Sequence, residues 1–290
     1  MAPKESSPMK IANVSGRLVI VTDEGGIDVE TASAGRFGPD PQAIYGQWRA
    51  FRAWADHAPP GSATAIDNNE LGPPAPGPAQ VFAIGMNYRD HAAETGLEVP
   101  SRPATFTKFP TCVTAPFAAV VLPSEYVDWE VELVAVIGVR AYHVSQTSAW
   151  DHVAGVTVGQ DLSERVVQFA SGGQFSLGKS FPGFGPTGPW LVTPDELSDP
   201  DDLELGCSVD GREVQKSRTS QLVFGVPELI VQLSAVLPLL PGDLIFTGTP
   251  AGIGATRQPP QFLRPGQVLT SYIEDVGTMA NRLIAPPAQI

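Results

Sequence analysis

Residues 126–138 read YVDWEVELVAVIG, a run with the apolar content of a fully buried strand that nevertheless carries Glu130 and Glu132. Residues two apart on a strand project to the same side, so both carboxylates point one way. Val134 and Val136 continue that face. The other face is covered by Trp129, Val131, Leu133, Ala135 and Ile137. Two unpaired carboxylates are costly to desolvate, so this strand requires a cationic partner.

Two interpretations of the glutamate pair are open at this point. A hard divalent metal is the simplest cation that compensates two carboxylates on one face. Alternatively, the glutamates lie at a hydrated strand end or form salt bridges with arginines.

Asp161 bears on this choice because it follows a strand expected over 153–158. A carboxylate at that edge could complete an oxygen-only site with the two glutamates, although alone it is typical of a turn or cap. Three carboxylates without histidine or thiolate favour Mg²⁺ or Mn²⁺ over zinc.

The composition is that of an acidic globular chain. Of its 290 residues, 42% are hydrophobic and 17% charged, and the formal net charge is −13. This charge makes nucleic acid and anionic membrane surfaces poor partners. Cys112 and Cys207 have no metal-ligand spacing, so we expect inert thiols of a reducing compartment. Since the first residues lack the apolar segment of a secretory signal, we expect a cytoplasmic protein.

We expect two domains joined by a proline-rich linker. Residues 1–70 should form a small α+β domain, with a hairpin over 10–30 and a helix capped by Asp40. Residues 71–80, LGPPAPGPAQ, form the linker, and residues 81–290 form the larger domain.

The larger domain should be mostly β (α+β), with a few covering helices. Helices are expected only over 89–95 and 227–236. Short β-rich runs alternate with glycine and proline turns over 81–84, 105–109, 130–139, 153–158, 244–247 and 268–274.

Three further features suggest chemistry. His91 and Glu94 share a face of a helical turn, so the carboxylate can orient the imidazole and raise its basicity, unless the histidine is simply exposed. Lys179, in LGKSF, can act as a point charge for an oxyanion, although lone surface lysines are common. The stretch 241–254 lacks the ending of a P-loop, and Thr249 within it could instead contact a substrate carboxylate.

Taken in order, these pieces resemble the fumarylacetoacetate hydrolase family over about residues 80–284. One such motif is weakly specific, whereas six in this order are strongly specific. The motifs are G-x-N-Y-x-x-H-x-x-E at 85–94 with F-x-K at 106–108, E-x-E at 130–132, Asp161 with Arg165 and Gln168, G-K-S-F at 178–181, G-P-W at 188–190, and P-G-D-x-I-x-T-G-T-P at 241–250.

The resemblance implies a mixed β-sheet roll that forms a homodimer and binds Mg²⁺ or Mn²⁺. It also implies that His91 and Glu94 form a catalytic dyad on a segment that becomes an ordered lid when substrate binds. The residues implied as functional are the metal ligands Glu130, Glu132 and Asp161, the catalytic residues His91, Glu94 and Lys179, and the substrate-binding residues Tyr88, Arg165, Gln168 and Thr249.

The implied function is a divalent-metal-dependent hydrolase that cleaves a C–C bond of an acylpyruvate-like or other β-diketo acid through a metal-bound enolate. His91, held by Glu94, would activate the attacking water. Alternatives on the same site are oxaloacetate decarboxylation and isomerisation or hydration of a 2-oxo acid. A different class, a non-catalytic metal-binding protein, would not need the His91–Glu94 pair.

Three positions depart from the family pattern: Gln160 stands where asparagine is usual, and Val166 and Pro182 stand where aspartate is usual. Because two acidic neighbours are lost, we expect Lys179 and Arg165 to be more available to the substrate. We also expect a preference for a bulkier, partly hydrophobic acyl group over oxaloacetate. The apolar surface expected in the pocket comes from Val166, Val167, Phe169, Phe175 and Phe181.

Overall fold

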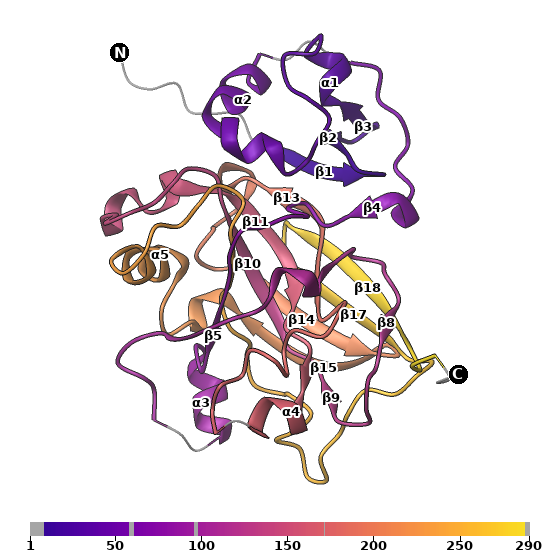
Figure 1. Ribbon diagram of the computed structural model, residues 1–290, viewed down its shortest axis with the longest axis vertical. Helices are drawn as coiled ribbons and strands as arrows, with labels where there is room; N and C mark the ends of the chain where they lie inside the picture. The colour runs from indigo at the N-terminus through magenta and orange to yellow at the C-terminus, as the bar shows by residue number, and fades with distance from the viewer. Residues whose placement is uncertain (1–8, 58–60, 96–97, 171, 288–290) are drawn as a thin grey trace.

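The computed structural model describes residues 9–57, 61–95, 98–170 and 172–287. Within these ranges two large β-sheets and few helices confirm the mostly β (α+β) fold class (Figure 1). An eleven-stranded sheet has the order β3-β2-β1-β13-β11-β10-β16-β5-β6, with β4 beside β1 and β7 beside β13. A five-stranded sheet has the order β15-β14-β17-β18-β8, and β12 pairs with β9. Both large sheets are mixed, because parallel pairs such as β16–β5 and β18–β8 interrupt the antiparallel pairing.

The strands of the larger sheet are β1 (Lys10–Val14), β2 (Arg17–Thr22), β3 (Gly25–Asp28), β4 (Leu71–Gly72), β5 (Val81–Gly85), β6 (Ala104–Thr107), β7 (Val113–Thr114), β10 (Val131–Ile137), β11 (Val153–Gln160), β13 (Gly185–Val192) and β16 (Leu244–Phe246). The remaining strands are β8 (Val120–Val121), β9 (Val127–Asp128), β12 (Ser163–Glu164), β14 (Glu204–Val209), β15 (Arg212–Arg218), β17 (Val268–Ile273) and β18 (Gly277–Ile284).

The α-helices are short, and several 3₁₀ turns connect the strands. The helices are α1 (Val29–Ala32), α2 (Trp48–Ala55), α3 (Arg89–Thr95), α4 (Arg165–Ala170) and α5 (Val226–Ser234). The turns are η1 (Ala43–Gln47), η2 (Asn68–Glu70), η3 (Pro110–Cys112), η4 (Gln146–Ser148), η5 (Trp150–His152), η6 (Pro194–Glu196) and η7 (Thr219–Gln221). In the part of the chain that the structure describes, none of these helices combines the length and the apolar content needed to cross a membrane.

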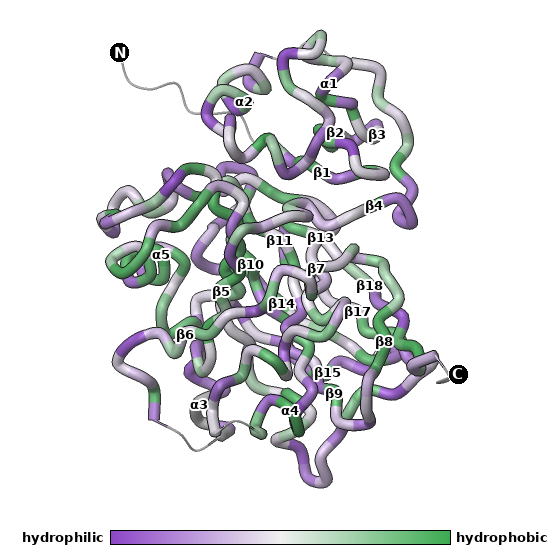
Figure 2. Tube along the Cα trace, in the orientation of Figure 1, coloured by the Kyte–Doolittle hydropathy of each residue, from purple (hydrophilic) through white to green (hydrophobic). Residues whose placement is uncertain are grey.

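The strand β10 lies between β11 and β16, and every one of its residues is buried. Its residues divide between two faces as the alternation of the sequence predicts, and each face belongs to a different core. The odd-numbered residues from 131 to 137 pack in a core that also contains Leu269 and Met279 of the five-stranded sheet. Val134 and Val136 pack in a second core on the other face. Figure 2 shows the apolar character of the β10 segment in the interior of the molecule.

The N-terminal elements continue the large sheet and build much of the second core. β1 pairs with β13, with Ile11 opposite Leu191, and β4 pairs with β1. Aromatic side chains of α2 and of the segments before it pack with Val134 and Val136. The division into residues 1–70, a linker over 71–80 and a domain over 81–290 stays a prediction. The aromatic residues of this core are Phe37, Tyr45, Trp48 and Phe51.

Most of the expected elements are present with ends shifted by a few residues. The six expected strands correspond to β5, β6, β10, β11, β16 and β17, and the two expected helices to α3 and α5. The cap assigned to Asp40 is wrong. Its carboxylate accepts a hydrogen bond from the Gln42 N–H at 2.8 Å, which closes a local turn before η1, and the α-helix begins only at Trp48.

We expect Phe51→Ala to lower the midpoint of thermal unfolding of the whole chain. Phe51 is fully buried against Phe37 and Trp48 in the core that also holds Val134, and loss of such a ring costs ~3–5 kcal/mol. Differential scanning calorimetry measures the midpoint, and Arg49→Ala, an exposed residue of the same helix, is the control. A separate early transition, or an unchanged midpoint, would contradict a shared core.

Candidate metal centre and active site

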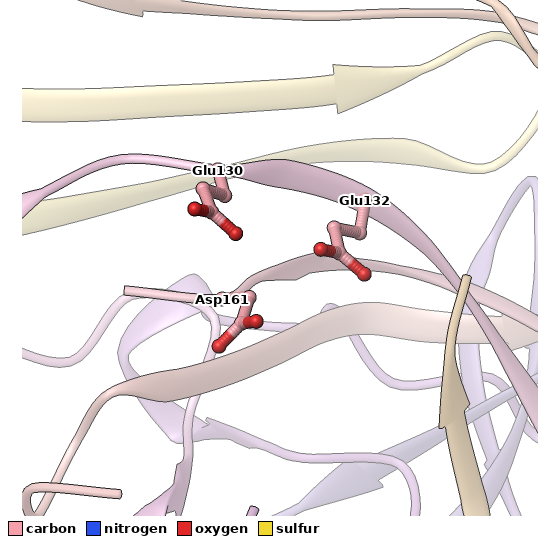
Figure 3. A group of neighbouring side chains, drawn as sticks. All are labelled: Glu130, Glu132 and Asp161. Carbon is pink, nitrogen blue, oxygen red and sulfur yellow. The ribbon is translucent and has the colours of Figure 1, made fainter. Parts of the chain in front are cut away.

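Glu130, Glu132 and Asp161 come together where β10 begins and β11 ends. Antiparallel pairing places Val131 opposite Gln160, so Asp161 lies beside Glu130 and its N–H donates to the Glu130 carbonyl at 2.9 Å. All three carboxylates are buried, and one oxygen of each lies within 4.8 Å of the others. Figure 3 shows the three side chains pointing toward one another.

Two lysines and an arginine compensate part of this negative charge. The Lys179 Nζ donates to Glu130 Oε2 and to Asp161 Oδ2, each at 2.6 Å. The Arg165 Nη1 lies 2.8 Å from Glu130 Oε1. Lys108, which is fully buried, donates to Asp161 Oδ1 at 2.6 Å and to two main-chain carbonyls, one of them that of Lys179.

Glu132 lacks such a partner. Its Oε2 accepts the N–H of Gly248 at 2.7 Å, but among the described residues no lysine, arginine or histidine forms an ion pair with it. Burial, and then the charges of Asp161 and Glu130, raise the pKa of the Glu132 carboxyl well above its ordinary value. Three convergent oxygen donors with one uncompensated carboxyl group fit a hard divalent cation.

The ion pairs of Glu130 and Lys179 shift the pKa of each group in the direction that keeps it charged. Burial alone would raise the pKa of the Glu130 carboxyl, but Lys179 and Arg165 lower it to about 2. Burial alone would lower the pKa of Lys179, but Asp161 and Glu130 raise it above its usual value. Glu130 therefore stays a carboxylate and Lys179 stays an ammonium group, which confirms the salt-bridge interpretation for Glu130. For Glu132 the metal interpretation stays a prediction.

The guanidinium group of Arg165 is held in place by the carboxylate of Asp128. Its Nε and Nη2 donate to Asp128 Oδ2 at 2.9 and 2.6 Å, and its Nη1 donates to Gln168 at 2.8 Å. Asp128 also accepts the N–H groups of Gly254 and Ala255. The expectation that Arg165 is more available to the substrate is therefore wrong, because two buried carboxylates already hold it. The same holds for Lys179, which is bound to Glu130 and Asp161.

A pocket of about 270 Å³ has Glu130 in its wall, together with residues of α3 and α4. These two helices lie at the end of the molecule away from the N-terminal elements (Figure 1). Of the predicted site residues, the pocket wall contains His91, Glu130, Arg165, Gln168, Lys179 and Thr249. The apolar wall residues are Ile84, Met86, Phe106, Phe169, Phe175, Ile253 and Ala255.

The imidazole of His91 is oriented by Glu94. The Nδ1 of His91 lies 3.1 Å from Glu94 Oε2, as the three-residue spacing on α3 predicts. The other oxygen of Glu94 accepts the N–H of Gly252 at 3.1 Å and the hydroxyl of Thr256 at 2.9 Å. These contacts tie the predicted lid segment to a loop whose residues Ile253, Ala255 and Thr256 line the pocket.

Tyr88 and Thr249, which we predicted to contact the substrate, occupy different positions relative to the pocket. Tyr88 is fully buried and does not belong to the pocket wall, and its hydroxyl has no hydrogen-bond partner within the described ranges. Thr249 does line the pocket. Its hydroxyl, however, donates to the Val131 carbonyl at 2.9 Å and accepts from Gln215 at 2.8 Å, so it already has two partners.

The three positions that depart from the family pattern differ in where they lie relative to the site. Gln160 is buried, and its amide accepts the Glu130 N–H at 2.8 Å and donates to Ser271 at 2.9 Å, which fixes the start of β10. Val166 and Pro182 are exposed and lie outside the pocket wall. Their effect on the pocket is therefore not direct contact with a ligand.

Sequence reasoning missed three residues that support the site. Lys108 belonged only to a motif, although it is the most deeply buried of the cations. Asp128 carried a readable signal, because it lies two residues before Glu130 and so projects to the same side of the chain. Thr256 carried none, since its contact with Glu94 spans 162 positions.

Fold and site together are those of a metal-site enzyme. A model of the fumarylacetoacetate (FAA) hydrolase C-terminal domain matches residues 80–284. A mitochondrial oxaloacetate tautomerase of Homo sapiens is 44% identical over 214 residues, which cover 73% of this chain and 68% of that protein. A protein of Burkholderia cenocepacia named as a hydrolase is 45% identical over 204 residues, with 69% and 72% covered. The chain belongs to the fumarylacetoacetate hydrolase family.

Solved structures agree with this membership. An HpcE-type protein from Mycobacterium smegmatis superposes with a TM-score of 0.91 at 52% identity, covering 96% of this chain and 100% of that chain. A maleylpyruvate hydrolase from Sphingobium, in complex with manganese(II) and pyruvate, gives a TM-score of 0.74 at 27% identity, again over 96% and 100%. The expected homodimer and cytoplasmic location stay predictions, and some relatives are named as mitochondrial.

We expect Glu132→Gln to weaken Mn²⁺ binding at least tenfold while leaving the fold intact. Glu132 supplies a negative oxygen donor but is no partner of Lys108, Lys179 or Arg165, so its neutral isostere keeps the ion pairs that surround it. Isothermal titration calorimetry on metal-depleted protein measures the affinity.

The matched control is Glu164→Gln, which neutralises an equally buried carboxyl group outside the triad. Its Mn²⁺ affinity should stay at the wild-type value. Unchanged affinity in Glu132→Gln would remove this residue from the ligand set.

Proposed function

We propose that this protein is a divalent-metal-dependent hydrolase that cleaves the carbon–carbon bond of an acylpyruvate-like or other β-diketo acid. The observation that carries the proposal is the pairing of His91 with Glu94 at 3.1 Å in the wall of the pocket that also contains Glu130. A histidine held by a carboxylate is suited to activate water, and binding of a metal alone does not require it.

The proposed cofactor is Mg²⁺ or Mn²⁺, held by Glu130, Glu132 and Asp161. When bound, such a cation supplies Lewis-acid stabilisation of the negative charge that develops on the oxygens of a 2-oxo acid. The maleylpyruvate hydrolase from Sphingobium, whose structure is a complex with manganese(II) and pyruvate, supports this choice of metal and ligand class.

His91 would act as the general base. With its Nδ1 hydrogen held by Glu94, proton transfer belongs to Nε2. Water adds to the acyl carbonyl as its proton passes to His91, and the bond between the acyl carbon and C3 then breaks. C3 takes up a proton, so the products are a carboxylic acid and pyruvate.

Lys179 would stabilise the oxygen that becomes negative as water adds. Two of the three N–H groups of its ammonium are engaged by Glu130 and Asp161, which fix the direction of the third. Because Lys179 lines the pocket and its charge is maintained, it can act as a preorganised donor. Arg165 and Gln168 would complete the polar wall on the α4 side.

A second candidate function uses the same centre without water. Relatives named oxaloacetate tautomerase support enolisation of a 2-oxo acid, and a decarboxylase or isomerase would need the same stabilisation of charge. These reactions require the carboxylate centre but not a water molecule activated by His91. The structural neighbours named as isomerases point the same way.

The direct test is turnover of acetylpyruvate by metal-depleted enzyme after addition of Mg²⁺ or Mn²⁺. We expect pyruvate and acetate in equal amounts, and no activity in EDTA, because the divalent cation that would stabilise the charge on the 2-oxo acid is then absent. Product analysis by NMR measures both. Enolisation without cleavage would favour the tautomerase over the hydrolase.

Replacing His91 with alanine should separate the two chemistries. We expect acetylpyruvate hydrolysis to fall by ~10²–10⁴, the range for loss of a general base, with Mn²⁺ affinity unchanged. Tautomerisation or decarboxylation of oxaloacetate should fall much less. An equal loss of both activities would show that His91 does not act mainly on water.

A further inference from the structure

The apolar side of the pocket is a row of three phenylalanine rings. The Lys179 Nζ lies 5.2 Å from the centroid of the Phe106 ring. Phe175 packs edge-on against Phe106, and Phe169 packs edge-on against Phe175, each with centroids 5.7 Å apart. The row therefore leads from the buried lysine to the mouth of the pocket, where Phe169 is 59% exposed.

These rings come from three separate segments of the chain. Phe106 lies on β6, Phe175 lies in the loop before Lys179, and Phe169 lies on α4. A single exposed phenylalanine is ordinary, but here the exposed ring extends a pair that lines the pocket. Convergence of three segments on one apolar wall is what a binding site for an apolar group requires.

The charges in the pocket wall are already matched. Within the described ranges its basic residues are His91, Arg165 and Lys179, and each of them contacts a carboxylate. A second carboxylate on the substrate, placed against the phenylalanine rings, would lose water without gaining a cation. Such burial of an uncompensated charge is strongly unfavourable.

The net charge of the buried cluster also indicates a substrate with a single carboxylate. Four buried carboxylates face three buried cations, so a divalent ion leaves the cluster with one positive charge. A single carboxylate, that of the 2-oxo acid, neutralises it. The carboxylates are Asp128, Glu130, Glu132 and Asp161, and the cations are Lys108, Arg165 and Lys179.

We infer that the pocket selects a monocarboxylate 2-oxo acid with an apolar acyl arm, and that Phe106, Phe175 and Phe169 form the subsite for that arm. This inference rests on the proposed function, whose substrate class it narrows. It sets the chain apart from relatives named for oxaloacetate, which is a dicarboxylate.

The test compares two substrates of equal length, pentanoylpyruvate and glutarylpyruvate, which differ by a carboxylate in place of the terminal methyl. We expect kcat/KM to favour pentanoylpyruvate by about tenfold or more, the order expected when a binding contact is lost. Equal values, or a preference for glutarylpyruvate, would overturn the inference.

Phe169→Ala should lower kcat/KM for pentanoylpyruvate about tenfold, mainly through KM, and reduce the difference between the two substrates. Phe169→Lys should shift the preference toward glutarylpyruvate, because it adds a cation at the mouth of the pocket. The matched control is Val166→Ala on the same helix, where the side chain is 58% exposed but lies outside the pocket wall. If Val166→Ala changes the preference as much as Phe169→Ala does, the subsite assignment fails.

Equilibrium binding keeps this inference separate from the proposed function. With Mn²⁺ present, calorimetry should give tighter binding of 2-oxoheptanoate than of 2-oxoheptanedioate, whether or not acylpyruvates are cleaved. Absence of cleavage with this difference intact would contradict only the hydrolase. Equal affinities would contradict the subsite even if cleavage occurs.

Discussion

The site depends on the burial of negative charge where β10 meets β11. Desolvated carboxylates are tolerated only with close cationic partners, so the segments that carry those partners are held in place. Lys108 shows how far this reaches, because it bonds Asp161 and also the main-chain carbonyl of Lys179. One lysine thus positions the loop that delivers the other, and with that loop the pocket wall on the same side.

The charged cluster directly adjoins the hydrophobic cores, since the Lys108 Nζ lies 5.7 Å from the centroid of the Phe246 ring. Both faces of β10 are covered along Val131–Ile137, one by the five-stranded sheet and the other partly by aromatic residues of the N-terminal elements. The same face that buries Val134 and Val136 presents Glu132 and Glu130 at the start of the strand. A single strand therefore serves as a core element along most of its length and presents buried carboxylates at one end.

Local periodicity accounts for what the sequence could predict. The two-residue alternation of β10 predicted which residues share each face, and the three-residue spacing of His91 and Glu94 predicted their contact. Long-range pairing could not be read in the same way. Arg165 meets Asp128 across 37 positions and Lys108 meets Asp161 across 53, so no local pattern shows that these cations are already paired. β13 and β15 were also missed, because glycine and proline interrupt one and polar residues dominate the other.

The two proposed functions would share one carboxylate centre, because both need negative charge to be stabilised on a 2-oxo acid. Polarising a 2-oxo acid favours enolisation whether or not water then attacks. The second step depends on groups above the centre, since water must reach a base while the acyl arm is held. In this chain Glu94 contacts both His91 and the loop at Gly252 and Thr256, so the orientation of His91 is linked to a loop that borders the pocket. If His91 is the base of the proposed hydrolase, its orientation therefore depends on the loop at Gly252 and Thr256, whereas the proposed apolar subsite is built from other segments, β6, α4 and the loop before Lys179.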